Sequence, residues 1–204
     1  MIYPFLHRKV IFPIRSKRFK FAAVMIPIHF TNGNPNVILI KSTKLVKNHA
    51  GEICFPGGIF MDKDVKMLVT ALREISEEIG IKLKREQIIG YLDTERTLTS
   101  SYIIYPYVAL MDSLPKIINT NYEVEKILDA PLIPLLKSRE SDLNRQRQYS
   151  DPHLPKFTYK NEVIWGATAR ILDQLANFFS SEINNWILTN SITSDLTVLY
   201  LISL

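Results

Sequence analysis

Apolar and polar residues recur along the chain with two different periods, which predicts a mixed α+β fold. Residues 21–30 and 37–41 are two apolar runs separated by a turn rich in Asn, Gly and Pro, so they predict a β-hairpin. Four further apolar runs predict strands, at residues 52–55, 87–92, 102–110 and 157–163. The Pro-Gly-Gly segment that ends the first of these is expected to be a turn, open to close approach by other groups.

Helical periodicity is clearest at residues 65–79, where Leu and Ile recur at spacings of three and four. The residues expected to face the core are Leu68, Leu72, Ile75 and Ile79. Gly80 is expected to end this helix. A short helix is predicted at residues 122–128 and a longer one at 165–179, with Ile171, Leu172, Leu175 and Phe178 inward. The polar stretch 137–155 is predicted to be a long surface loop.

Composition indicates a globular chain: 47% of the 204 residues are hydrophobic and 22% are charged. The longest apolar runs, residues 21–28 and 196–204, fall short of the roughly 20 residues that span a membrane, so we expect a soluble protein. The lone Cys54 is typical of a reducing compartment, and a cytoplasmic location is expected. The expected parts are a basic arm at 1–20, one domain at 21–180, and a tail at 181–204 that packs on the domain or on a homodimer partner.

Charge is distributed unevenly, although the net charge is only +5. The first 51 residues contain nine Lys or Arg and no Asp or Glu, whereas the remainder carries 16 basic and 20 acidic residues. A basic segment of this kind suits nucleic acid, a membrane surface or an anionic small molecule, and it is also compatible with a solvated face. A transit peptide is disfavoured because Pro4, Pro13 and the scarcity of Ser do not suit an amphipathic presequence.

Three carboxylates share one side of the helix predicted at residues 65–79. Glu74, Glu77 and Glu78 fall within about 100° of one another around the helix axis, apart from the apolar stripe. Their mutual repulsion costs stability unless a cation or an Arg neutralises it. Oxygen-only ligands favour Mg²⁺ or Mn²⁺ over Zn²⁺. The alternative is an idle, solvated acidic face, which is the commoner origin of an isolated pattern of this type.

The pattern is not isolated, because a diglycine precedes the helix and residues 73–81 read Arg-Glu-Ile-Ser-Glu-Glu-Ile-Gly-Ile. This segment resembles the second half of the Nudix hydrolase box at every fixed position. The first half departs from the box. Fourteen residues, rather than thirteen, separate Gly58 from Arg73, and Asp64 stands near the place of the first Glu.

In the extra residue and in Asp64, the sequence resembles the coenzyme A pyrophosphatase branch of the Nudix family. Lys47, Gly51 and the Phe-Pro-Gly-Gly of residues 55–58 keep the spacing of that branch's upstream motif. Residues 164–172 resemble its Trp-Gly-x-Thr-Ala-Arg helix, so the resemblance runs from about residue 21 to residue 179. In the upstream motif, Lys47 replaces an Arg, Ser42 a second Arg and Ile40 a Thr. Lys lacks the bidentate fork of Arg, so metal-dependent chemistry is indicated more firmly than substrate identity.

The resemblance implies a Nudix fold, a mixed β-sheet between helices, and hydrolysis of a diphosphate that requires Mg²⁺ or Mn²⁺. For coenzyme A or its derivatives, the products are 4′-phosphopantetheine and adenosine 3′,5′-bisphosphate. Glu74 and Glu78 are the implied principal metal ligands, and the Gly58 carbonyl completes the shell. Glu77 is a third ligand or the base that orients water. Arg73 either orients a carboxylate or forms a plain surface ion pair.

The remaining candidates concern the substrate. The resemblance implies substrate contacts for Lys47, His49, Gly51, Phe55, Gly57 and Gly58. Glu123 is either a late carboxylate of the site or part of a solvated face, and Cys54 is expected to be a buried small apolar residue. Trp165 and Tyr102 belong to the core or the rim of the site, unless one of them stacks on an adenine.

Two other functions remain open at this point. A Nudix hydrolase acting on a nucleoside triphosphate, nucleotide sugar or dinucleotide is compatible with Ser42 and Lys47. A Nudix module that binds RNA or a nucleotide without turnover is compatible with the basic segment. The intact carboxylates Glu74, Glu77 and Glu78 argue against this second alternative, and nucleic acid is not the expected partner.

Overall fold

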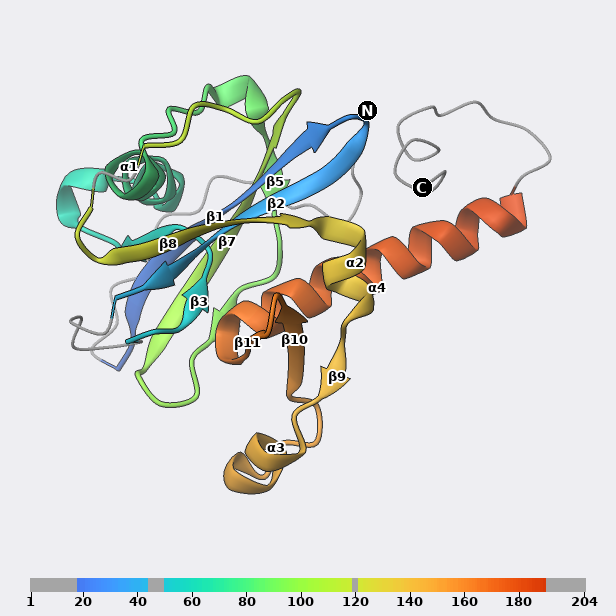
Figure 1. The fold of residues 1–204 in the computed structure, drawn as a ribbon. Coiled ribbons are helices and arrows are strands. Elements are labelled where there is room, and N and C mark those ends of the chain that lie inside the picture. Colours follow the sequence, from blue (N-terminus) through green and yellow to red (C-terminus); the bar gives the residue numbers. More distant parts are fainter. Residues whose placement is uncertain (1–17, 44–49, 119–120, 190–204) are drawn as a thin grey trace.

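A mixed β-sheet forms the centre of the computed structural model, which describes residues 18–43, 50–118 and 121–189, with side chains as far as residue 180 (Figure 1). Its strands are β1 (Lys20–Thr31), β2 (Asn34–Ser42), β3 (Ile53–Cys54), β4 (Gly57–Ile59), β5 (Ile88–Tyr91), β6 (Glu95–Arg96), β7 (Tyr102–Met111) and β8 (Val124–Pro131). The main order is β3-β2-β1-β7-β5, with β8 on β2, β4 on β1 and β6 on β7. The β1 and β7 strands pair in parallel, whereas β2 and β4 are antiparallel to β1. The predicted hairpin is confirmed.

Helices cover both faces of this sheet. The helices of the described residues are α1 (Met67–Ile79), α2 (Leu132–Lys137), α3 (Leu143–Tyr149) and α4 (Gly166–Thr189), with 3₁₀ turns at Asp62–Asp64 and Arg85–Gln87. A small second sheet consists of β9 (Glu140–Ser141), β10 (Pro155–Tyr159) and β11 (Glu162–Ile164). Figure 1 shows α1 on one face of the main sheet and α2 with α4 on the other. The predicted Nudix-type arrangement of a mixed sheet between helices is therefore confirmed.

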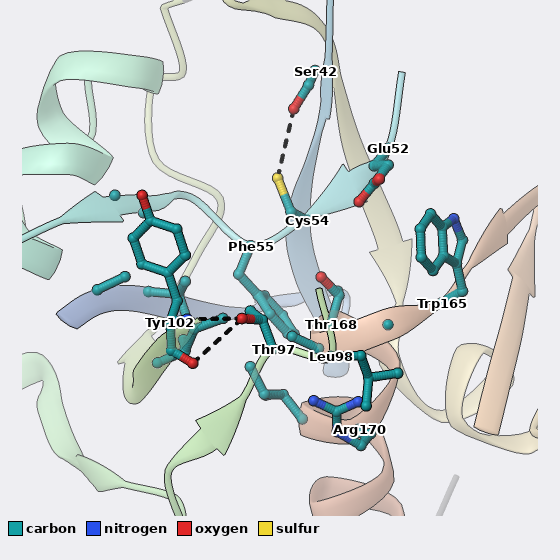
Figure 2. Close-up of a pocket in the computed structure, with 18 of the residues that line it drawn as sticks. Ser42, Glu52, Cys54, Phe55, Thr97, Leu98, Tyr102, Trp165, Thr168 and Arg170 are labelled. Carbon is teal, nitrogen blue, oxygen red and sulfur yellow. Dashed lines mark hydrogen bonds between the residues drawn. The ribbon is translucent and has the colours of Figure 1, made fainter. Parts of the chain in front are cut away.

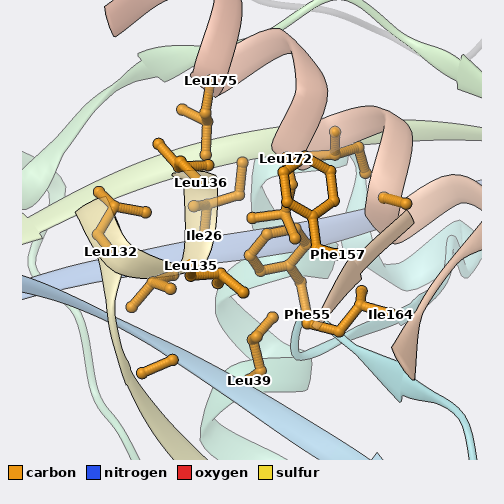
Figure 3. Packing of buried hydrophobic residues seen from close by; sticks show 14 of the residues in the cluster. Ile26, Leu39, Phe55, Leu132, Leu135, Leu136, Phe157, Ile164, Leu172 and Leu175 are labelled. Carbon is orange, nitrogen blue, oxygen red and sulfur yellow. The ribbon is translucent and has the colours of Figure 1, made fainter. Parts of the chain in front are cut away.

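Alternate residues of the central strands supply two separate cores. In β1, Ala23 and Met25 pack in the cluster that includes α1, whereas Ile26 and Ile28 pack in the cluster that includes α2 and α4. Figure 3 shows the second cluster, in which Phe55 meets residues of β10 and α4. Both faces of β1 and β2 are thus buried, which explains why these strands are continuous apolar runs in the sequence.

The segment from β3 to β4, residues 53–59, lies between β1 and β2 where these two strands diverge, and we call it the wedge. The β2 strand pairs with β1 near the hairpin turn and with β3 at residues 40–41, while β4 pairs with residues 22–24 of β1. The diglycine predicted as a turn is therefore strand, which corrects that expectation. A Cβ on Gly57 would lie 2.5 Å from the Ala23 carbonyl oxygen, so the close approach of two backbones explains the glycine.

Two local predictions are wrong. Residues 122–128, predicted as helix, fall largely in β8, because Val124, Leu128 and Ala130 are buried while the strand pairs along β2. The stretch 137–155, predicted as a loop, contains the end of α2, β9 and α3. Asp142 caps the start of α3, because its side chain accepts a hydrogen bond from the backbone N–H of Arg145. The α3 helix itself has no buried residue.

The helix predicted at residues 65–79 is confirmed with a later start. Ile75 and Ile79 are fully buried, whereas Leu68 and Leu72 are only partly buried. Gly80 ends the helix with φ 71°, as predicted. The α4 helix is also confirmed and continues to residue 189, with Phe178 only partly buried. Across the described ranges, no helix is both long and apolar enough to cross a membrane.

Candidate active site

Arg73, near the middle of α1, joins the acidic residues of this region. Its Nη1 donates to Glu74 Oε1 at 2.7 Å and to Glu77 Oε2 at 3.0 Å. Its Nη2 also donates to the Ile59 carbonyl oxygen at 3.3 Å, which ties α1 to β4. The side chain is largely buried, so it is more than the plain surface ion pair that the sequence leaves open. Hydrogen bonds, chiefly to Asp64, raise the pKa of the Arg73 guanidinium.

Asp64 holds the other side of that guanidinium. Its two carboxylate oxygens accept from Arg73 Nε at 2.9 Å and Nη2 at 3.0 Å, a bidentate pair. The Asp64 carboxylate also accepts from the Thr70 hydroxyl and from the Met61 backbone N–H, each at 3.0 Å. The side chain is only 2% exposed. The hydrogen bonds from Arg73 lower the pKa of Asp64 to about 2, so this buried group is an anion at neutral pH.

Glu78, one helical turn after Glu74, also faces the wedge. Its Oε2 accepts a hydrogen bond from the Gly57 backbone N–H at 2.9 Å, and the residue is 8% exposed. Burial raises the pKa of Glu78 to about 8, and the negative charges of Glu74, Glu123 and Glu77 act in the same direction. Among the residues that the structure describes, negative charges gather around Glu78, and its hydrogen bond comes from a backbone N–H rather than from a positive side chain. A bound cation would relieve this arrangement.

Glu74 lies against the second glycine of the wedge. A Cβ on Gly58 would come within 2.3 Å of Glu74 Oε1, so the carboxyl group occupies the space that a side chain would fill. Burial raises the pKa of Glu74, opposed by the hydrogen bond from Arg73. The packing of two backbone segments and one carboxyl group therefore requires glycine at positions 57 and 58.

A cavity of about 330 Å³ opens beside the wedge (Figure 2). Along one side it is lined by Phe55, Gly57, Gly58 and Glu78, and Glu52 and Glu123 also reach it. Glu123 lies at the cavity and is also exposed to solvent, so both interpretations of this residue stay predictions.

Another part of the lining comes from Trp165 and the first turns of α4, where Figure 2 labels Trp165, Thr168 and Arg170. Arg170 Nε donates to Glu95 Oε2 at 2.8 Å, and its Nη2 donates to the Arg96 carbonyl oxygen. These bonds attach the first turns of α4 to β6. Tyr102 and Tyr149 also line the cavity.

The structure brings together only some of the residues expected to contact substrate. Phe55, Gly57 and Gly58 line the cavity, whereas Gly51 does not belong to its lining and bonds through its N–H to the Ser42 carbonyl oxygen. Lys47 and His49 lie outside the described residues. The carboxylates Glu74, Glu77 and Glu78 do gather beside the wedge, although only Glu78 lines the cavity.

The donor set suits a hard divalent cation that is bound together with its substrate. In the part of the chain that the structure describes, no three carboxylate, imidazole or thiol groups converge into a closed metal cage. Glu74 and Glu77 turn to Arg73, and Glu78 to the Gly57 N–H. Proteins usually hold Mg²⁺ with one or two carboxylates, water molecules and substrate phosphates, so this open arrangement of oxygens fits the ion.

The sequence pattern does not reveal the partner of Asp64 or the presence of Tyr149 in the site. Asp64 was expected only as a departure from the box, yet it is the buried anion that holds Arg73. Tyr149 reaches the cavity from α3, a helix that periodicity does not reveal. Cys54 also lines the cavity, and burial raises the pKa of its thiol to about 12, which disfavours the reactive thiolate at neutral pH.

Comparison with known proteins identifies the family. Residues 20–135 match the model of the NUDIX domain, a stretch that holds the main sheet and α1. The chain belongs to the Nudix family, and it is a Nudix hydrolase of the diphosphatase class.

Its relatives include the Nudix hydrolase NudL of Photorhabdus laumondii, itself described as uncharacterized, which is 32% identical over 76% of this chain and 82% of its own length. The NudL protein of Yersinia pestis is 32% identical over 76% of this chain and 77% of its own length.

Solved structures share the fold at low sequence identity. A MutT/nudix family protein from Enterococcus faecalis superposes with a TM-score of 0.58 at 12% identity, covering 84% of this chain and 65% of that protein. The NUDIX domain of Shewanella oneidensis NrtR, solved in complex with ADP ribose, gives a TM-score of 0.51 at 19% identity, covering 60% of this chain and 79% of that one. Both likenesses support the fold alone.

Proposed function

We propose that this Nudix hydrolase cleaves the diphosphate linkage of coenzyme A or one of its derivatives in the presence of Mg²⁺ or Mn²⁺. The products would be 4′-phosphopantetheine and adenosine 3′,5′-bisphosphate. The cavity supports this proposal most directly, because its lining combines Glu78 and the diglycine of β4 with residues 165–170 at the start of α4. Both parts of the lining consist of segments that resemble the motifs of the coenzyme A pyrophosphatase branch.

The proposed metal ligands are Glu74 and Glu78, with Glu77 and the Gly58 carbonyl as further donors. A bound Mg²⁺ would neutralise charge on the diphosphate and lower the pKa of a coordinated water molecule. Glu74 and Glu78 are one turn apart on α1, which is the spacing at which two carboxylates share one side of a helix. Their burial and mutual repulsion support this role, because such a cluster is costly without a cation.

Arg73 and Asp64 would position the carboxylates rather than contact the substrate. The guanidinium holds Glu74 and Glu77 through one nitrogen, and Asp64 fixes the guanidinium from behind. A carboxylate held by Arg through a defined hydrogen bond keeps one rotamer, which favours a fixed donor geometry. Glu77 is about half exposed and therefore accessible to solvent, which suits either a third ligand or the group that orients water.

Substrate recognition would involve the loop that leads into the wedge. We propose Lys47, His49 and Gly51 as contacts, on the motif resemblance alone, together with the cavity residues Phe55, Gly57 and Gly58. A Lys ammonium provides a phosphate with a point charge and with up to three donors. We also propose a cytoplasmic location, which the lone Cys54 supports.

A second substrate class is favoured by one specific observation. The NUDIX domain of Shewanella oneidensis NrtR is described in complex with ADP ribose and shares the fold. We therefore take ADP ribose, a nucleotide sugar of the class that the sequence leaves open, as the alternative substrate to test. Coenzyme A and ADP ribose both contain an adenosine joined to a diphosphate.

The test is hydrolysis of coenzyme A and ADP ribose by the purified protein with Mg²⁺ or Mn²⁺, with products identified by mass spectrometry. Glu78→Gln should lower turnover by at least about a hundredfold while the circular dichroism spectrum is unchanged. Glu86→Gln, which alters an exposed carboxylate away from the cavity, is the matched control and should retain full turnover. Full turnover in Glu78→Gln, or cleavage of ADP ribose in preference to coenzyme A, would overturn the proposal.

A further inference from the structure

The indole of Trp165 is held rigidly at the wall of the cavity. Arg145 lies over this ring, with its guanidinium carbon 3.9 Å from the ring centroid, which is a close cation–π contact. The Arg145 Nη1 donates to Asp142 Oδ2 at 2.8 Å, and Asp142 is only 4% exposed. A buried carboxylate thus fixes the guanidinium, and the guanidinium fixes one face of the indole.

One face of the indole is covered by Arg145, and Trp165 nevertheless reaches the cavity. Trp165 belongs to the cavity lining, whereas Arg145 does not. The indole is partly exposed, and Figure 2 shows it at the same opening as Glu52 and Thr168. Its free surface is therefore available to a ligand in the cavity.

A flat aromatic group matches this wall better than a flexible chain does. A rigid indole with one face occupied by a cation presents a planar, polarisable surface, and stacking of a base on such a surface contributes substantially to binding. An aliphatic arm gains little from planarity. Glu78 and the diglycine supply a different part of the lining, at which the diphosphate would lie.

We propose that Trp165 is the stacking platform for the adenine ring of the substrate, and that Arg145 and Asp142 position this platform. The proposal rests on the proposed function, because that function supplies a substrate in which an adenosine is joined to a diphosphate. It assigns the two ends of the substrate to the two parts of the lining: the diphosphate to β4 and α1, and the base to the start of α4. The pantetheine arm would leave the cavity elsewhere.

Fluorescence tests the proposal directly, since the chain contains only two Trp residues, Trp165 and Trp186. In the Trp186→Phe protein, emission comes from Trp165 alone. We would titrate this protein with adenosine 3′,5′-bisphosphate and, separately, with 4′-phosphopantetheine, in EDTA so that no turnover occurs. Saturable quenching by the nucleotide and none by 4′-phosphopantetheine is expected. Quenching by 4′-phosphopantetheine alone, or by neither compound, would overturn the assignment.

Binding affinity supplies the second readout. In the otherwise unaltered chain, Trp165→Leu should weaken binding of adenosine 3′,5′-bisphosphate in EDTA about tenfold or more, whereas Trp165→Phe should recover most of the loss. Arg145→Gln, which keeps the indole but removes the cation over its ring, should weaken binding about two- to fivefold. Unchanged affinity in Trp165→Leu would refute the platform.

The outcomes separate this inference from the proposed function. Nucleotide quenching without hydrolysis of coenzyme A would retain the adenine site and reject coenzyme A as substrate. Hydrolysis of coenzyme A without quenching would retain the proposed function and reject Trp165 as the platform.

Discussion

Gly58 of β4 lies directly against the carboxyl group of Glu74 on α1, and a Cβ at position 58 would come within 2.3 Å of Glu74 Oε1. The neighbouring Gly57 has a different obstacle, since its Cβ would meet the backbone of Ala23 and Val24. The two glycines of the wedge are thus required for different reasons. One makes room for an acidic side chain of the proposed metal site, and the other for the strand pairing that holds the wedge in place.

Alanine substitutions should separate these two roles. Gly58→Ala pushes on the end of a flexible side chain, so it should displace the Glu74 carboxyl group and lower turnover at least tenfold, with little loss of stability. Gly57→Ala pushes on backbone and should lower the free energy of unfolding by about 1–3 kcal/mol. Urea unfolding and a hydrolysis assay on both variants would check this. Equal loss of stability in the two variants would contradict it.

Asp64 should contribute stability that depends on pH. Its pKa is about 2 in the folded protein, against an ordinary value of 3.8, so the folded state favours the anion. The contribution, about 2 kcal/mol, should be fully present above pH 4 and disappear as the pH falls toward 2. In EDTA, Asp64→Asn should therefore be less stable than the unaltered protein at pH 6, by a margin that narrows below pH 4.

The control for this experiment is Asp62→Asn, which alters an exposed carboxylate in the same 3₁₀ turn. It should change the free energy of unfolding by less than about 0.5 kcal/mol at either pH. A similar loss in both variants would show that the contacts of Asp64 with Arg73 and Thr70 add nothing specific.

Glu78 should reduce stability in the absence of a cation. Its pKa is raised to about 8 by burial, from an ordinary value of 4.5, so the folded state binds a proton that the unfolded state releases. Stability should accordingly fall as the pH rises from about 4.5 to 8. Glu78→Gln keeps an acceptor for the Gly57 N–H and removes the charge. In EDTA it should be more stable than the unaltered protein by about 2–3 kcal/mol near pH 7.

The measurement is thermal or urea unfolding at pH 5 and pH 7, with and without Mg²⁺. The gain in the free energy of unfolding from Glu78→Gln should be small at pH 5. Mg²⁺ should stabilise the unaltered protein more than the variant. If the two proteins are equally stable at pH 7 in EDTA, Glu78 is not the strained carboxylate that its burial indicates.

The helix of the acidic cluster was predictable because its determinants are local. Ile75 and Ile79 recur at helical spacing, and Gly80 adopts the left-handed conformation that ends the helix. The strand β8 was not predictable in this way, because Val124 and Leu128 are spaced like residues on one side of a helix. Pairing along β2 makes residues 124–131 a strand instead, and such pairing joins residues about 90 apart in the chain.

The central strands, the helix that carries Glu74, Glu77 and Glu78, and the family of the box can all be read from the amino-acid sequence. These depend on periodicity and on spacing within about 25 residues. Three features became visible only in the folded chain: Asp64 is the buried partner of Arg73, the diglycine is a strand between β1 and β2, and Trp165 lines the cavity with Arg145 over its ring. The physical reason is that each of these contacts joins separate elements, whose approach is set by packing on the two faces of the sheet rather than by local preference.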